Sequence, residues 1–179
     1  MMPSPNRLEA DSWAFALDIY ARPGIADACL SLQNRADVDV MMLLVIAFAA
    51  ARLRILLAPA EIRELDEVCR PWREQIVWPL RAIRSGLKSG PLPAPSSGTE
   101  QFRSKIKTAE LAAEQLQNKL LAERLSQRPP KSGAVSAEEV RTVLGCVVSL
   151  FVDKRGRKPD ADLSSSIGKI VDAVMQEVR

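Results

Sequence analysis

Five basic side chains between residues 70 and 88 have a spacing that suits anion binding. On an ideal helix they fall within an arc of about 80°; they are Arg70, Arg73, Arg81, Arg84 and Lys88. Two forked guanidinium groups three residues apart, at Arg81 and Arg84, suit a phosphate or a carboxylate. The favoured alternative is internal pairing with acidic residues of adjacent helices, at Glu61, Glu64, Glu110 or Glu114. The pattern predicts either these ion pairs or a face that binds a nucleotide, a phosphorylated partner or an acidic peptide.

A heptad stripe in residues 100–127 is typical of a helix that packs against another helix. Its apolar residues follow at steps of 4, 3, 4, 3 and 4, and we call them the seam: Phe102, Ile106, Ala109, Ala113, Leu116 and Leu120. Charged flanks select register and partner in such helices; here they are Lys105, Lys107, Glu110, Glu114 and Lys119. We expect the seam to pack on its own domain, on a second copy of the chain or on another protein.

Most catalytic chemistry lacks its usual residues in this chain. There is no histidine, which removes the commonest general base and metal ligand. No Gly-rich phosphate loop, paired-acid pocket or metal-ligand spacing is recognisable. The three cysteines are far apart in apolar helical settings, so we expect reduced core thiols at Cys29, Cys69 and Cys146. We therefore predict a protein that is not an enzyme, with no catalytic residues, no metal site and no cofactor.

Two further charged motifs have simple structural interpretations. Asp37 and Asp39 form an Asp-x-Asp pair ahead of an apolar helix, where a helix cap is favoured over a metal ligand. The basic run Lys154–Lys158 lacks interleaved aromatic residues and is flanked by Asp153 and Asp160. We expect it to form an exposed turn, and binding of nucleic acid phosphates or an anionic membrane surface is the less favoured alternative. A net charge of +3 over 179 residues is also too small to indicate a polyanionic partner by itself.

An apolar run of twelve residues from Val40 to Ala51 organises the predicted fold. As a helix it spans about 18 Å, which is too short for the ~30 Å core of a membrane, so we expect a buried central helix and no membrane span. Amphipathic helical patterns surround it. The predicted fold is all-α: a compact helical bundle with a long amphipathic helix and a C-terminal helical hairpin.

Pro/Gly/Ser-rich segments predict how the chain is divided. We expect a helical domain at residues 10–127 with a linker at 86–99 inside it, a second linker at 128–135, and the helical hairpin at 136–179. The hairpin opens with a capping box, Ser136 to Glu139, although a strand is a minor alternative for its β-branched stretch.

Three local signals mark helix ends and breaks. Asp11 or Ser12 is expected to cap the first helix. Pro71 is expected to begin a new helix, because its missing N–H costs nothing in a first turn. Pro79 lies inside that helix and predicts a kink between Gln75 and Trp78.

Four motifs carry a resemblance to a known family. They are F-A-L-x-x-Y-A-R-P-G-I-x-x-A-C-L-x-L-Q at Phe15–Gln33, D-V-x-x-L-L at Asp39–Leu44, W-R-x-x-x-V-x-P-L-R-x-x-R-x-x-L-K at Trp72–Lys88, and K-x-A-E-L-x-A-E at Lys107–Glu114. Over about residues 12–126 the chain resembles a family of small uncharacterised proteobacterial proteins, known mainly as a domain of unknown function. The chain departs from the family pattern at Asp37, where glycine is usual, and it lacks the tryptophan usual in the central helix. The resemblance implies an intracellular helical protein and supplies no catalytic residues.

We therefore expect a cytoplasmic protein that acts as a protein-protein interaction or adaptor module. Its partner would be an unidentified protein or a second copy, bound through the helix at 100–127. The alternative function is binding of an anion, a phosphate or a nucleic acid by the basic stripe. The N-terminal segment has no apolar stretch of the kind found in signal peptides, which agrees with a cytoplasmic location.

Overall fold

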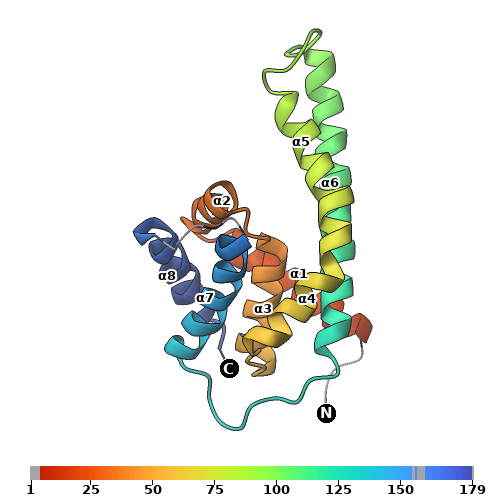
Figure 1. Cartoon of the computed structure of the whole chain (residues 1–179). Coiled ribbons are helices and arrows are strands. Elements are labelled where there is room, and N and C mark those ends of the chain that lie inside the picture. Colours follow the sequence, from red (N-terminus) through yellow and green to blue (C-terminus); the bar gives the residue numbers. More distant parts are fainter. Residues whose placement is uncertain (1–4, 155, 157–159, 179) are drawn as a thin grey trace.

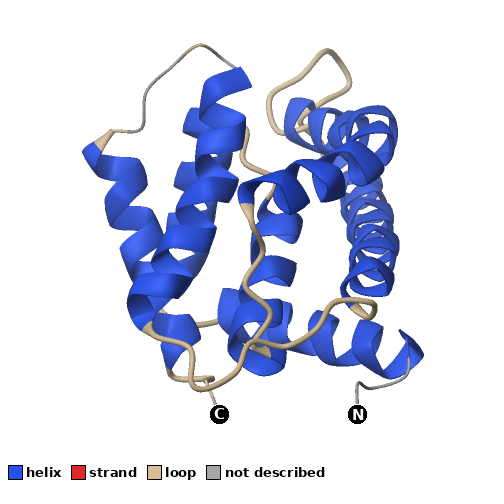
Figure 2. Cartoon of the chain, turned by 60° about the horizontal axis from the view of Figure 1, so that its bottom comes forward, coloured by secondary structure: helices blue, strands red, loops and turns tan. Residues whose placement is uncertain are grey.

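The computed structural model describes residues 5–154, 156 and 160–178, and within them every regular element is a helix (Figures 1 and 2). This confirms the all-α fold. The elements in chain order are α1 (Pro5–Tyr20), α2 (Ile25–Ala36), α3 (Val40–Leu53), α4 (Pro59–Trp72), the π-helical turn η1 (Arg73–Val77), α5 (Trp78–Gly86), α6 (Ser97–Leu125), α7 (Ala137–Lys154) and α8 (Ala161–Met175).

Helix α3 is the predicted central helix. Every residue from Met42 to Ala51 is buried, and α1, α6, α7 and α8 all pack against it. Asp39 caps the helix by accepting a hydrogen bond from the Met42 backbone N–H at 3.0 Å, as one of the two predicted caps. Asp37 instead ends α2 with φ 51°, in the left-handed region. The positive end of this apolar helix is therefore matched by a carboxylate.

The C-terminal hairpin of α7 and α8 belongs to the same hydrophobic core as α1–α4. Helix α8 lies along α2, and α7 packs on α3 and α4. The predicted capping box is present, because Ser136 Oγ accepts from the Glu139 N–H at 3.2 Å and Glu139 accepts from the Ser136 N–H at 2.9 Å. The strand alternative for this stretch is wrong: its β-branched side chains fill the buried face of α7.

Two predicted helix starts are wrong. Helix α1 already begins at Pro5, so Asp11 and Ser12 lie inside it, and buried Ser12 donates a hydrogen bond to Asn118 Oδ1 on α6 at 2.8 Å. Helix α4 continues through Pro71. Glu67, four residues earlier, loses the N–H that its carbonyl would accept from, but it lies on an exposed side of the helix where water replaces that donor.

A two-helix arm projects from the helical body (Figure 1). It consists of residues 74–116, in which α5 runs antiparallel to the first half of α6 and the loop at 87–96 joins them. The loop approaches itself closely at its start, since a Cβ on Gly90 would lie 2.4 Å from the Gly86 carbonyl oxygen. Ser96 and Thr99 form the capping box that starts α6. Near Pro79, the expected break in the helix takes the form of the wide turn η1.

None of the helices in the described residues combines the length and the apolar character needed to cross a bilayer.

Candidate functional site

A buried ion-pair cluster centres on Arg73, the first residue of η1. Its guanidinium donates to Asp39 Oδ2 at 3.0 Å and to Asp66 Oδ1 at 2.9 Å. Asp39 also accepts from the Gln117 amide at 2.5 Å, and Asp66 accepts from Lys154 Nζ at 2.6 Å. Arg73, Asp66 and Gln117 are at most 2% exposed. Two carboxylates, two cations and one amide thus tie α3, α4, α6 and α7 together at one point.

Aromatic rings complete the surroundings of Arg73. Its guanidinium carbon lies 5.5 Å from the centroid of Trp78 and 5.1 Å from that of Phe151, within range of cation–π attraction. The wide turn of η1 accommodates Arg73 on the buried side of an otherwise regular helix. Every carboxylate in the cluster accepts from a cation or an amide, so the cluster has the character of a structural element more than of a reactive centre. We call it the clamp; its members are Asp39, Asp66, Arg73, Gln117 and Lys154.

The predicted basic stripe is divided between the interior and the surface. Arg73 lies inside the clamp, whereas Arg70 is partly exposed, 3.8 Å from Asp66. Lys88 is exposed near the tip of the arm. The structure brings only Arg81 and Arg84 together, and it pairs them with α6: Arg81 binds Glu110 at 2.9 Å and Glu114 at 2.6 Å, and Arg84 binds Glu110. Internal pairing, the favoured alternative, is the arrangement found there, and anion binding stays a prediction.

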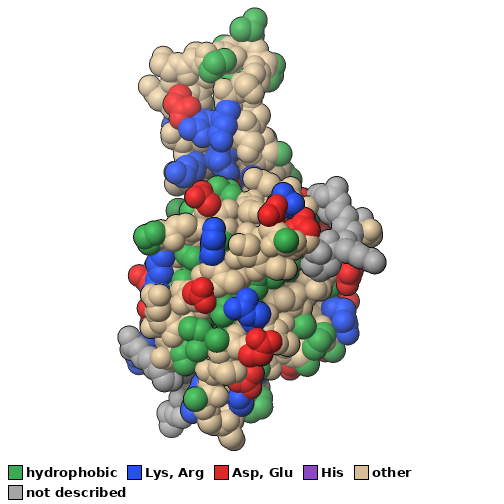
Figure 3. Space-filling model, turned by 90° about the vertical axis from the view of Figure 1, so that its left-hand side faces the viewer, with side chains coloured by type: hydrophobic (Ala, Val, Ile, Leu, Met, Phe, Trp, Pro, Cys, Tyr) green, Lys and Arg blue, Asp and Glu red, His purple; other side chains and the backbone are tan. Residues whose placement is uncertain are grey.

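These four residues make one side of the arm charged. Figure 3 shows Lys and Arg side chains gathered on the arm, on the side that looks toward α2. Burial raises the pKa of the Tyr20 hydroxyl at the end of α1. The charges of Glu114, Arg81 and Arg84 also act on this hydroxyl, which therefore lies near the charged side.

The pKa values of the two carboxyl groups on the charged side, Glu110 and Glu114, are shifted in opposite directions. Burial alone would raise the pKa of Glu110, but hydrogen bonds from Arg84 and Arg81 outweigh it and the pKa is lowered. Burial raises the pKa of Glu114 more than Arg81 lowers it, and the negative charges of Glu110 and Asp39 add to the rise. Glu110, which binds both arginines, therefore keeps its charge to a lower pH than Glu114 does.

We expect Glu110→Gln to lower the free energy of unfolding by about 1–3 kcal/mol at pH 7, because the three hydrogen bonds from Arg81 and Arg84 lose the charge of their acceptor. A lowered pKa means that Glu110 stabilises the fold above its ordinary value of about 4.5 and loses this effect as the pH falls through the folded-state value. The difference between the variant and the wild type should therefore shrink in acid. Urea unfolding at pH 7, 4.5 and 3 measures it, and a difference that stays constant would contradict the assignment.

The seam is only partly covered by its own chain. Ala113 is buried and Ile106 and Leu120 are half-buried, but Phe102 and Leu116 are 50% and 55% exposed. The side of α6 that packs internally is rotated from the seam, and its buried residues are Glu110, Ala113, Gln117, Asn118, Leu121, Ala122 and Leu125. Docking on its own domain thus accounts for only part of the heptad pattern.

Four of the five large exposed apolar residues in the helical segments of the arm lie on one side, opposite the charged side; the fifth, Leu111, lies elsewhere around α6. At about 100° per residue, Ile83 lies about 100° from Arg84 and 160° from Arg81 around α5. Likewise Leu116 lies about 120° from Glu110 and 160° from Glu114 around α6. We call this side the apolar face; its large exposed members are Ile76, Ile83, Phe102 and Leu116.

The other features singled out in the sequence do not assemble into a reactive site. Burial raises the pKa of Cys29 and Cys69 to about 12, so both thiols are unreactive near neutral pH. Among the described residues, no three His, Cys, Asp or Glu side chains form a metal-binding group. The predicted turn at Lys154–Lys158 lies largely outside the described residues, and Lys154 itself belongs to the clamp.

A shallow depression of about 350 Å³ lies between α4 and α6. Its lining combines two arginines with one acid and apolar groups: Glu64, Leu65, Val68, Arg124, Gln127 and Arg128. Arg128 there binds Glu61 and Glu64. The lining of the depression therefore pairs its one acid with Arg128 and contains no arrangement of acid, base and nucleophile.

Comparison with known proteins gives one match. The model of a family described as "Protein of unknown function (DUF2390)" matches residues 11–121, which run from α1 into the second half of α6. No curated protein and no solved structure matches the chain. The matched residues contain the whole arm, α3, α4 and the part of α6 that carries Gln117.

Proposed function

The chain belongs to a family of proteins of unknown function, DUF2390, and from this premise we propose that it is a non-enzymatic interaction module that binds a helical protein surface through the apolar face of its arm. The observation that carries the proposal is the exposure of Ile83, Phe102 and Leu116, at 48%, 50% and 55%, on one side of a projecting hairpin. Large contiguous apolar patches rimmed by polar residues are typical of interaction sites.

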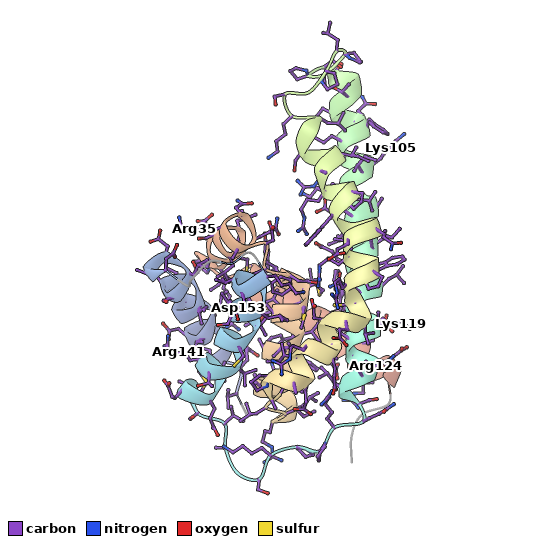
Figure 4. All side chains as sticks on the ribbon, viewed as in Figure 1. Arg35, Lys105, Lys119, Arg124, Arg141 and Asp153 are labelled. Atoms are coloured by element: carbon purple, nitrogen blue, oxygen red, sulfur yellow. The ribbon has the colours of Figure 1, made fainter. Side chains whose placement is uncertain are left out.

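The composition of the arm supports this assignment. On the charged side, Arg81 and Arg84 form ion pairs with Glu110 and Glu114, so these groups already have partners within the arm. The surface of the arm that remains for a binding partner is the apolar face. Lys105 and Lys119 lie at the rim of that face; Lys105 points outward from the arm (Figure 4), and Lys119 lies 4.0 Å from Glu9 of α1. Apolar centres with charged rims are the usual anatomy of helix-pairing surfaces.

A matched pair of leucines on α6 tests the proposal. Leu116 lies on the apolar face and Leu111, 47% exposed, lies about 140° away around the same helix. A pull-down from a lysate of the source organism should recover a protein that Leu116→Asp loses and Leu111→Asp retains. Equal recovery by both variants would contradict binding through this face.

The competing function is anion binding by Arg81 and Arg84, which would have to exchange Glu110 and Glu114 for the ligand. The same pull-down, run with and without nuclease on Arg81→Ala/Arg84→Ala, separates the two proposals. Recovery of nucleic acid or of a phosphorylated species, lost only in the double variant, would favour the anion site and overturn the interaction module.

A further inference from the structure

The seam has the same pattern when read in either direction. Its steps of 4, 3, 4, 3 and 4 are symmetric about residue 111, and so are its sizes, with two alanines at the centre and large residues outside. If two copies of α6 lie antiparallel about this point, Phe102 meets Leu120 and Ile106 meets Leu116. At the centre Ala109 lies opposite Ala113, which its own chain already buries. Small residues at the centre let the two helices approach closely, while the larger pairs fill the ends.

The second helix of the arm shares this symmetry. Along η1 and α5, Ile76 and Ile83 flank a midpoint at residues 79–80. Arg81 bonds to both Glu110 and Glu114, and helical side chains lean toward the N-terminus of their own helix, which sets residues 79–80 beside the middle of the seam. A two-fold axis through the centre of the seam therefore also places Ile76 of one copy against Ile83 of the other.

The size of the apolar face suits a stable dimer. From Phe102 to Leu120 the seam extends about 27 Å, and two helices about 10 Å apart make a face roughly 20 Å wide. The projected area is about 550 Å², and protruding side chains increase the accessible area. This approaches the roughly 800 Å² per partner of a stable specific interface.

Building on the proposed interaction function, we propose that the apolar face of the arm binds the same face of a second copy, with the two arms antiparallel in a four-helix bundle. In that arrangement every neighbouring pair of helices is antiparallel, as in up-and-down bundles. Lys105 of one copy lies near Lys119 of the other, and Glu9, whose carboxylate is 4.0 Å from Lys119 Nζ, supplies the opposite charge.

A second copy fits this face better than a single foreign helix does. One helix, about 10–12 Å across, would pack in the groove between the seam and α5 and would leave the outer edges of a face about 20 Å wide exposed. Only a partner that is itself two helices wide, with large residues at matching heights, covers Ile76, Ile83, Phe102 and Leu116 together. A second arm meets both requirements through its own sequence.

The first test is the molecular mass of the full chain in solution. Sedimentation equilibrium should give twice the chain mass of 19.7 kDa. Leu116→Asp buries two carboxylates at the interface and should raise the dissociation constant about 100-fold or more, whereas Leu111→Asp should leave it unchanged. Circular dichroism confirms that both variants remain helical. A monomeric wild type at about 100 μM, or equal dissociation of both variants, would overturn the proposal.

Disulfide trapping then tests the antiparallel register. In a Cys146→Ser background, chains carrying Ile106→Cys mixed with chains carrying Leu116→Cys should form a mixed disulfide. Leu116→Cys alone should not cross-link, since its two copies lie about 15 Å apart along the bundle, beyond the reach of a disulfide. Efficient homodimer cross-linking at Leu116→Cys with no mixed product would show parallel arms and overturn this arrangement.

Failure of this inference differs from failure of the proposed function. A monomeric chain whose apolar face still captures another protein in a Leu116-dependent way refutes the second copy and leaves the interaction module intact. A monomer that captures nothing through this face refutes both.

Discussion

Arg73→Leu is expected to lower the free energy of unfolding by about 3–5 kcal/mol. The substitution leaves Asp39 and Asp66 without their shared guanidinium, and Asp66 is only 2% exposed. Lys154 remains with Asp66, and Gln117 with Asp39, but an amide does not neutralise a carboxylate. Urea unfolding at pH 7, followed by circular dichroism, measures the loss.

Arg70→Leu is the matched control for this prediction. Arg70 approaches the same carboxylate at 3.8 Å, but its side chain is 40% exposed, so its removal should cost less than about 1 kcal/mol. Adding Asp66→Asn to Arg73→Leu should recover part of the loss by removing one buried charge. A cost below 1 kcal/mol for Arg73→Leu itself would show that the clamp does not stabilise the fold.

Phe48→Ala is expected to have an effect of similar size for an unrelated reason. Phe48 lies in α3 at 3% exposure, and its ring packs edge-on against Phe15 with centroids 5.6 Å apart. Removing the ring leaves a cavity in the most enclosed part of the protein, which costs about 3–5 kcal/mol. Thermal unfolding measured at one fixed protein concentration reports the change.

A second phenylalanine provides the comparison. Phe102→Ala removes the same atoms from a residue of the arm that is 50% exposed, so within one chain it should cost less than about 1 kcal/mol. Measurements at low concentration separate this effect from self-association. If both substitutions cost the same, the burial of α3 would not be the source of stability inferred for it.

Periodicity predicted the architecture well because it reports which residues avoid water. The run Val40–Ala51 has no polar side, and only the centre of a helical bundle satisfies such a helix. The capping box at Ser136 and the helix cap at Asp39 were predictable because both depend on residues within one turn.

The clamp could not be predicted in this way. Arg73 fits the basic stripe by spacing, but its burial depends on Asp39 and Asp66, which lie 34 and 7 residues away and come from other turns. Sequence spacing within one helix does not show which charges meet across helices. The W-R pair at Trp72 and Arg73 was a signal, as part of a motif that fixed many residue types, but it gave no indication of burial. For the same reason the pairing of Arg81 and Arg84 stood beforehand only as one alternative.

The core shared by the first and last helices has a consequence for synthesis on the ribosome. Helix α3 is complete at residue 53, but α7 and α8, which cover part of it, end at residues 154 and 175. At a synthesis rate of about 5–20 residues per second, roughly 6–24 s pass between the addition of residue 53 and that of residue 175. During that interval α3, the most apolar segment of the nascent chain, is not yet covered by α7 and α8. It is therefore the segment that a ribosome-associated chaperone would hold.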